Sequence, residues 1–219
     1  AFRGCFVSYP FAYRGVALLV EDDIEQIQAL MGQAPGDQAI PFVGPPVLRD
    51  LESGRTLSQV PAIVLHIAGE LDLLPEDPFD VAMCMKVLMD CNDLLMEICR
   101  YNGSMMWERE EWVVFRAERL PRWLAIFEES LERSSLGQAR VTFADLGTYA
   151  LFGNMMRCLP ELEPDVTAHA PGIHALCREI GAVPTLAEYV AEEQALYGTV
   201  YCGGQIEESI RTMLALDSG

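Results

Sequence analysis

Hydrophobic and polar positions divide the chain into a mixed first part and a helical second part. Between residues 1 and 70 the apolar runs are short and lie between turn-forming residues, which predicts strands alternating with helices. We expect a strand over 3–9, a helix over 13–21 and a second strand over 24–31. After a connecting loop, two further strands and a helix complete the predicted order β-α-β, loop, β-β-α.

Prolines mark the end of this first part. Pro45 and Pro46 cannot donate to a sheet, so we expect them at the start or edge of a strand, with one X-Pro bond a candidate for the cis form. The next two residues, Val47 and Leu48, predict a very short buried strand, and 51–55 predicts a hairpin turn. Pro61 then opens an apolar run, which predicts a buried helix with proline in its first turn.

The second part shows apolar residues at every third or fourth position, as is typical of helices. Long helices are predicted over 78–101 and 110–133, with Pro121 expected to break or kink the second. Thr142 and Asp145 have the spacing of a capping box and predict another helix start. Further helices are expected within 160–169, at 171–181, at 184–197 and after Gly203-Gly204.

These patterns divide the chain into three parts: an α/β domain over 1–70, a proline-bearing linker over 71–79, and an all-helical domain over 80–219 with an extra C-terminal helix.

Composition and charge narrow the classes of function. The chain carries 33 acidic and 15 basic residues, a net charge of −18, and such a surface repels phosphate backbones, so no nucleic-acid binding is expected. Half of the residues are apolar, yet no apolar run is long enough for a transmembrane segment, which predicts a soluble protein.

Seven cysteines, an odd number without CxxC or zinc-finger spacing, predict buried reduced thiols and no metal site. We therefore expect a cytoplasmic protein, or one in the reducing interior of an organelle. The start at Ala1 rather than Met is compatible with a removed N-terminal leader.

Four segments resemble, in the right order, motifs of the glutathione S-transferase superfamily. Pro46-Val47-Leu48 resembles its cis-Pro-x-Leu element, and 57–68 resembles the segment that enters its third helix. The segment 141–152 resembles its capping-box helix, and 158–190 resembles its closing helices. The resemblance implies an α/β thioredoxin-like N-terminal domain plus an all-α C-terminal domain, and a homodimer.

The resemblance also implies a glutathione site in the first domain. The helix start after Gln59, with the backbone N–H of Val60, would hold the γ-glutamyl carboxylate, because free donors and the helix dipole favour an anion there. The segment with Pro45 and Pro46 would offer backbone groups to the cysteinyl part of the peptide.

A hydroxyl group near the end of the first strand would stabilise the glutathione thiolate, the form that attacks an electrophile. Ser8 and Tyr13 are the two catalytic candidates. Arg14 resembles the arginine that follows the first loop in several classes of the family.

Two departures from the family pattern keep the function open. Val60 stands where the family usually has serine, which removes one hydroxyl donor to the carboxylate. The segment 24–44 contains no lysine, arginine or tryptophan to hold the glycine carboxylate of glutathione.

Two hypotheses follow. The chain is either a glutathione transferase that acts on an apolar electrophile or peroxide, or a non-catalytic scaffold or accessory subunit of a larger complex. In the second case the extra C-terminal helix would dock on a partner through Ile206, Ile210, Met213 and Leu214. A thiol-disulfide oxidoreductase is disfavoured, because Cys5 comes too early in the first predicted strand.

Overall fold

Helices make up most of the computed structural model, which describes residues 2–133, 136–138 and 140–217. In chain order they are α1 (Cys5–Tyr13), α2 (Ile24–Met31), α3 (Val60–Glu70), α4 (Pro78–Ile98), α5 (Arg100–Gly103), α6 (Arg109–Val114), α7 (Leu120–Arg133), α8 (Phe143–Thr148), α9 (Asn154–Cys158), α10 (Glu163–His169), α11 (Pro171–Gly181), α12 (Pro184–Tyr197) and α13 (Gly204–Asp217). Two strands, β1 (Val47–Arg49) and β2 (Thr56–Ser58), precede α3. Short 3₁₀-helices cover Phe2–Gly4 (η1) and Pro160–Leu162 (η4), and π-helical turns cover Phe115–Arg119 (η2) and Tyr149–Gly153 (η3).

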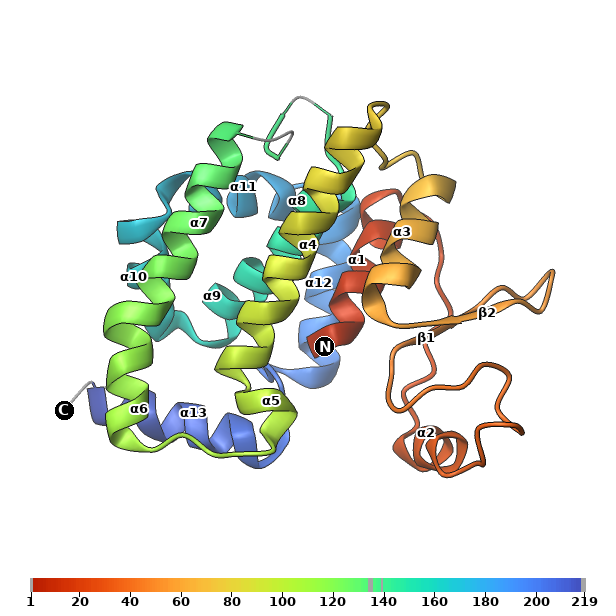
Figure 1. Ribbon diagram of the computed structural model, residues 1–219, viewed down its shortest axis with the longest axis horizontal. Coiled ribbons are helices and arrows are strands. Elements are labelled where there is room, and N and C mark those ends of the chain that lie inside the picture. Colours follow the sequence, from red (N-terminus) through yellow and green to blue (C-terminus); the bar gives the residue numbers. More distant parts are fainter. Residues whose placement is uncertain (1, 134–135, 139, 218–219) are drawn as a thin grey trace.

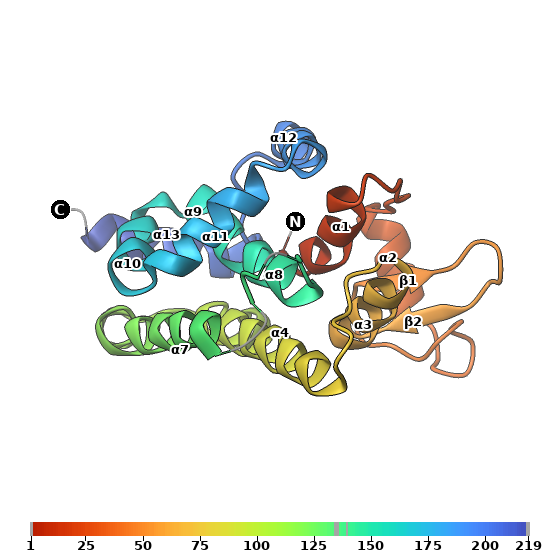
Figure 2. The same cartoon turned by 90° about the horizontal axis from the view of Figure 1, so that it is seen from above.

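The second part of the chain forms two layers of helices. Figure 2 shows α4 and α7 side by side in one layer, with α8, α10 and α11 packed against them in the other. The layers meet through aromatic side chains such as Phe127 and Phe152, whose ring centroids lie 4.9 Å apart in an edge-to-face arrangement. The helical C-terminal part expected from the sequence is confirmed.

Two sequence signals in this part act as predicted. Asp145 closes a capping box at the start of α8, because its carboxylate accepts from the backbone N–H and the hydroxyl of Thr142 at 2.7 and 2.6 Å. The predicted helix over 110–133 is interrupted by the π-helical turn η2, where Leu120 N–H donates to Phe115 C=O. This wider turn directly precedes Pro121, which has no N–H to continue the helical ladder.

The first helix, α1, corrects the strand predicted over 3–9 and the helix predicted over 13–21. Most of α1 is buried, and it packs against α3, α8 and α12 (Figure 1). A short apolar run bounded by turn residues does not distinguish a buried strand from a buried helix, which explains the error. The helix ends early because Gly15 takes a left-handed conformation, with φ of +65°, that favours glycine.

Helix α2 corrects the strand predicted over 24–31. Asp23 is its N-cap, since its side chain accepts from the backbone N–H groups of Glu25 and Gln26 at 2.9 and 3.2 Å. None of the residues of α2 is buried. Figure 1 shows α2 and the hairpin at the side of the molecule away from α7 and α10.

The strands β1 and β2 form the predicted hairpin, antiparallel, with Leu48 opposite Leu57. The peptide bond between Pro45 and Pro46 is cis, as the sequence suggested. The strand itself is not buried, because Val47 is exposed and Leu48 only half-buried. This hairpin is the only sheet in the described ranges, so a complete thioredoxin-like sheet is not clearly shown.

Helix α3 begins as predicted, with Pro61 in its first turn, but it is buried on one side only. Ile63, Val64 and Ile67 face the interior, whereas Leu65 is 39% exposed. The irregular segment from Leu71 to Asp77 then leads into α4. The division of the chain at 71–79 into two domains stays a prediction.

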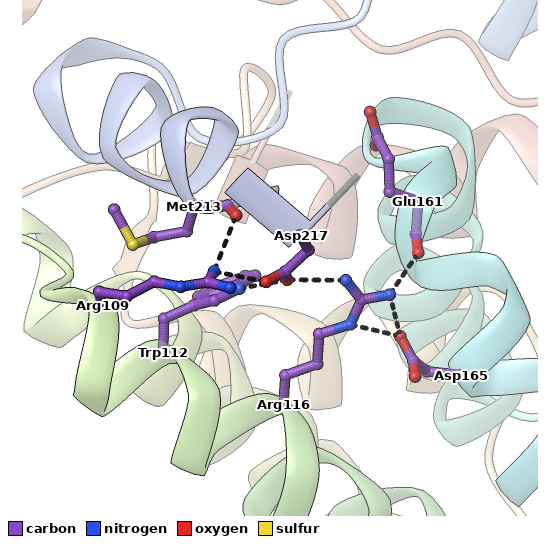
Figure 3. Close-up of polar contacts among 7 residues, drawn as sticks. All are labelled: Arg109, Trp112, Arg116, Glu161, Asp165, Met213 and Asp217. Atoms are coloured by element: carbon purple, nitrogen blue, oxygen red, sulfur yellow. Dashed lines mark hydrogen bonds and ion pairs between the residues drawn. The ribbon is translucent and has the colours of Figure 1, made fainter. Parts of the chain in front are cut away.

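The last helix, α13, packs on its own chain. Ile206, Ile210, Met213 and Leu214 are all buried, which corrects the expectation that they face a partner. Figure 3 shows how the end of α13 is attached: the Asp217 carboxylate accepts from Trp112 Nε1 at 2.9 Å, from Arg116 Nη1 at 2.8 Å, and from Arg109.

Candidate functional site

A cavity with a volume of about 720 Å³ lies where several parts of the chain meet. These are η1 with the N-terminal half of α1, the segment before α2, the segment that leads into β1, and the C-terminal half of α12. Its lining is mainly apolar, with a few polar and charged side chains among the apolar ones. This composition is typical of small-molecule sites. The lining includes Phe2, Arg3, Val7, Ser8, Leu18, Val20, Glu21, Asp22, Pro45, Pro46, Leu48, Tyr189, Glu192, Leu196 and Tyr197.

Ser8 lines the cavity from α1, although it lies within a helix and not near the end of a strand. Its side chain is almost fully buried, and Tyr189 from α12 lines the same cavity. Burial raises the pKa of Tyr189, and the Ser8 hydroxyl partly opposes this shift. A pair of hydroxyl groups from two helices therefore lies at the wall of the cavity.

Pro45 and Pro46 reach the same cavity from the segment before β1. They are separated from Ser8 by more than thirty residues of sequence, so the fold brings two of the predicted site segments together.

The other predicted site residues are not among those that line this cavity in the described part of the chain. Tyr13 lies in the last turn of α1, where its carbonyl oxygen accepts from Thr185 Oγ1 at 3.1 Å. Arg14 follows it, and its Nε donates to the carbonyl oxygen of Leu71 at 2.8 Å. Both residues therefore connect the end of α1 to other parts of the backbone.

Gln59 and Val60 lie at the start of α3, next to the cavity and not in its wall. Gln59 is exposed, takes a left-handed φ of 72°, and is the N-cap residue, while Val60 is buried. Ser58, directly before them, pairs with Val47 of the cavity lining. Gln59 therefore follows directly after the strand residue that pairs with a lining residue.

A buried polar network lies behind the wall of the cavity. The Tyr9 hydroxyl lies 2.7 Å from Asn154 Oδ1 and 3.0 Å from Glu193 Oε2, and Arg157 Nη2 lies 3.6 Å from the same Glu193 oxygen. Burial raises the pKa of Tyr9, and a nearby Cys5 has its pKa raised to about 11, first by burial and then by the Glu193 charge. Both groups are therefore protonated at neutral pH and act as donors.

Sequence reasoning missed Arg3, the only cation in the lining of the cavity as described. Its guanidinium donates to Asn92 Oδ1 at 2.7 Å, to Asn102 Oδ1 at 3.0 Å and to the sulfur of Met96 at 2.9 Å, all neutral acceptors. Burial lowers the pKa of Arg3, but an arginine stays charged at neutral pH. Its position near a site depends on the packing of η1 on α4 and α5, for which the local sequence carries no signal.

A second, more open groove of about 890 Å³ lies between α4 and the helices α6 and α7. Its lining includes Trp107, Trp123 and a bidentate pair of Glu97 with Arg119 at 2.7 and 2.9 Å. None of the predicted site residues lines it in the described part of the chain. We therefore assign the candidate site to the smaller cavity, where predicted segments converge.

Over residues 2–133, 136–138 and 140–217, no group of three or more His, Cys, Asp or Glu side chains has an arrangement suited to a metal ion. None of the helices in those ranges combines the length and apolar character needed to cross a bilayer.

Solved structures show where this fold occurs. The chain is similar to a Pi-class glutathione S-transferase of Onchocerca volvulus, with a TM-score of 0.74 and 17% identity over 93% of this chain and 95% of that one. It is also similar to prostaglandin synthase D of Nilaparvata lugens (TM-score 0.70, 15% identity, 87% and 93% covered) and to rat hPGDS complexed with a quinoline (TM-score 0.67, 19% identity, 87% and 91% covered). At such identities the likeness supports the fold alone.

Sequence comparison supplies the family. Curated protein sequences give no match to the chain. Residues 83–213 match the family described as "Glutathione S-transferase, C-terminal domain", and this match covers more than half of the chain. The matched segment begins in α4 and ends in α13, so it includes the two helical layers described above. The chain therefore belongs to the glutathione S-transferase family.

Proposed function

We propose that this chain binds glutathione in the cavity between α1, the Pro45–Pro46 segment and α12, and transfers its thiolate to an apolar electrophile or a peroxide. The observation that carries the proposal is the convergence of Ser8 and the cis-proline segment on one largely apolar cavity of about 720 Å³. A volume of this size can hold a tripeptide beside a small apolar molecule.

The cysteinyl part and the γ-glutamyl part of glutathione are each assigned a complementary group. The backbone around Pro45 and Pro46 would bind the cysteinyl part, and the Ser8 hydroxyl would donate to the sulfur. A donor to the thiolate lowers the thiol pKa, because it stabilises the charged form more than the neutral one. The start of α3, with the Gln59 side chain and the Val60 N–H, would bind the γ-glutamyl carboxylate.

Arg3 supplies a positive charge that the sequence-based site lacked. Its hydrogen-bond partners are neutral, so its charge is available to a carboxylate of glutathione. This compensates in part for the absence of lysine, arginine and tryptophan between residues 24 and 44.

The apolar remainder of the cavity would hold the second substrate. Leu18, Val20 and Leu196 line it. The rat relative of this fold is complexed with a quinoline, an aromatic molecule, which supports an aromatic or similarly apolar partner for glutathione here. For assembly and location, the corresponding proposal is a homodimer in the cytoplasm or in a reducing organelle. The seven free cysteines support a reducing compartment.

The alternative, a non-catalytic scaffold, loses one of its supports, because the apolar side of α13 is buried within the chain. Calorimetric titration with glutathione tests the proposal. We expect binding in the micromolar to low-millimolar range that weakens in Arg3→Gln and in Gln59→Ala, with Arg55→Gln in the hairpin turn as a control outside the cavity lining. No heat and no thermal shift with glutathione at several millimolar would overturn it.

A further inference from the structure

We propose that the second substrate of this cavity is an apolar molecule that carries a positive charge, such as an aromatic ring with a protonated amine. This inference rests on the proposed function, since it specifies the substrate class of the same site. It follows from the distribution of charge around the cavity.

Acidic side chains line one side of the cavity. Glu21 and Asp22 come from the segment before α2, and Glu192 comes from α12. The two segments are adjacent there, because the Tyr197 hydroxyl of α12 donates to the Asp22 carboxylate. The three carboxylates therefore belong to one region of the wall.

Positive groups do not neutralise this region. In the described part of the chain Glu21, Asp22 and Glu192 form no ion pair. The partner of Asp22, Tyr197, is a neutral donor, since the Asp22 hydrogen bond, burial and the Asp22 charge together raise the pKa of this phenol to about 12. The negative charge on this side therefore remains available to a ligand.

Arg3, the one cation among the lining residues that the structure describes, lies away from this acidic region. Arg3 is held by Asn92 of α4 and Asn102 of α5, whereas the acidic side is formed by α12 and the segment before α2. Once a glutathione carboxylate has paired with Arg3, the net charge around the second substrate is negative.

Apolar and aromatic side chains line the same cavity. Leu18, Val20 and Leu196 lie there with the rings of Tyr189 and Tyr197. Tyrosine faces attract cations, and carboxylates attract an ammonium group. An apolar cation satisfies both features, whereas an apolar anion would be repelled.

Three naphthalene derivatives of nearly equal shape test this inference without glutathione: 1-naphthylmethylammonium, neutral 1-naphthylmethanol and 1-naphthylacetate. At low salt we expect the ammonium to bind about tenfold more tightly than the carboxylate, with the alcohol between them. The difference should shrink as salt is added, because surface charges are screened.

Variants on one helix show whether the acidic side is responsible. Glu192→Gln should reduce the preference for the ammonium by about threefold. Glu188→Gln, an equal change of charge one turn away on α12 and outside the lining, should leave it unchanged.

Binding of the carboxylate as tightly as the ammonium, or no binding of any of the three probes, would overturn the inference. A failure of the proposed function would instead be seen in the glutathione titration, which uses none of these probes. The two proposals can therefore fail separately.

Discussion

The hydroxyl of Tyr9 on α1 lies 3.0 Å from Oε2 of Glu193 on α12, in the interior of the protein. Glu193 also lines the cavity, so this contact joins the wall of the candidate site to the buried side of α1. Asn154 of α9 is the second acceptor, at 2.7 Å. Three helices that are far apart in sequence are thus connected through one hydroxyl group.

Removal of this hydroxyl should destabilise the fold. In Tyr9→Phe the ring can keep its place, but Glu193 and Asn154 lose a buried donor. We expect the free energy of unfolding to fall by about 1–3 kcal/mol, as measured by urea denaturation.

Tyr197→Phe is the matched control, because it deletes a hydroxyl that also bonds a carboxylate, Asp22, but at the surface. Its expected cost is about 1 kcal/mol or less, since water can replace the donor. Equal losses for the two variants would contradict the role given to burial.

Asp145 is a second buried carboxylate whose contribution to the stability of the fold can be tested. It accepts from the N–H groups of Thr142 and Gly137 at 2.7 and 2.6 Å and from the Thr142 hydroxyl, and its side chain is fully buried. Asp145→Ala leaves these donors without a partner in the interior. We expect a loss of about 2 kcal/mol or more in the free energy of unfolding.

The exposed N-cap Asp23 is the comparison. Asp23→Ala removes two similar hydrogen bonds at the start of α2, where water is available. The expected loss is about 1 kcal/mol or less. A larger effect at Asp23 than at Asp145 would be inconsistent with these structural roles.

The docking of α13 should depend on pH. Burial alone would raise the pKa of Asp217, but hydrogen bonds from Trp112, Arg116 and Arg109 lower it below its ordinary value (Figure 3). A carboxyl whose folded-state pKa is lowered contributes stability above its unfolded value, near 3.9, and this contribution is lost as pH falls further.

Asp217→Asn should therefore cost about 1 kcal/mol in the free energy of unfolding at pH 7, and clearly less at about pH 3. Urea denaturation at both pH values measures the difference. Glu208→Gln removes an exposed carboxylate from the same helix and should have little effect at either pH. A cost for Asp217→Asn that does not change with pH would show that the ionised carboxylate is not responsible.

Some elements could be predicted because their signals are local. The proline before a hairpin, the proline in the first turn of α3, and the capping box of Thr142 and Asp145 each depend on a few adjacent residues. Apolar residues at every third or fourth position likewise predict the helices of the second part, because each helix buries one side against a neighbouring layer.

Other elements could not be predicted, because the deciding contacts are distant in sequence. Residues 5–13 are apolar apart from Ser8, and only packing against α3, α8 and α12 shows that they form a helix. A local signal for α2 is nevertheless present, because Asp23 has the position of an N-cap and acidic Glu25 lies in the first turn.

The residues that line the cavity could likewise be predicted only in part. Ser8 and Pro46 were selected by resemblance to family motifs, whereas Arg3, Tyr189 and Glu192 were not recognised at all. The positions of Tyr189 and Glu192 depend on the packing of α12 beside α1, and that of Arg3 on the packing of η1 on α4 and α5. No short motif encodes either contact.

The choice between Ser8 and Tyr13 as the activating hydroxyl can be made with the glutathione complex. Ser8 lines the cavity, whereas Tyr13 lies in the last turn of α1 and is not part of the lining. In Ser8→Ala a thiolate in the cavity loses a donor. We expect the pKa of bound glutathione to rise by about one to two units, because a hydrogen bond to a charged group contributes about 1.5–3 kcal/mol.

Ultraviolet absorbance of the thiolate, recorded against pH with saturating glutathione, measures this pKa directly. The rate of reaction with an activated aryl chloride at pH 7 should fall in parallel in Ser8→Ala, because less of the bound thiol is ionised. Tyr13→Phe should leave both quantities unchanged. If Tyr13→Phe raises the pKa and Ser8→Ala does not, the sulfur lies at the C-terminal end of α1, and the position proposed for glutathione is wrong.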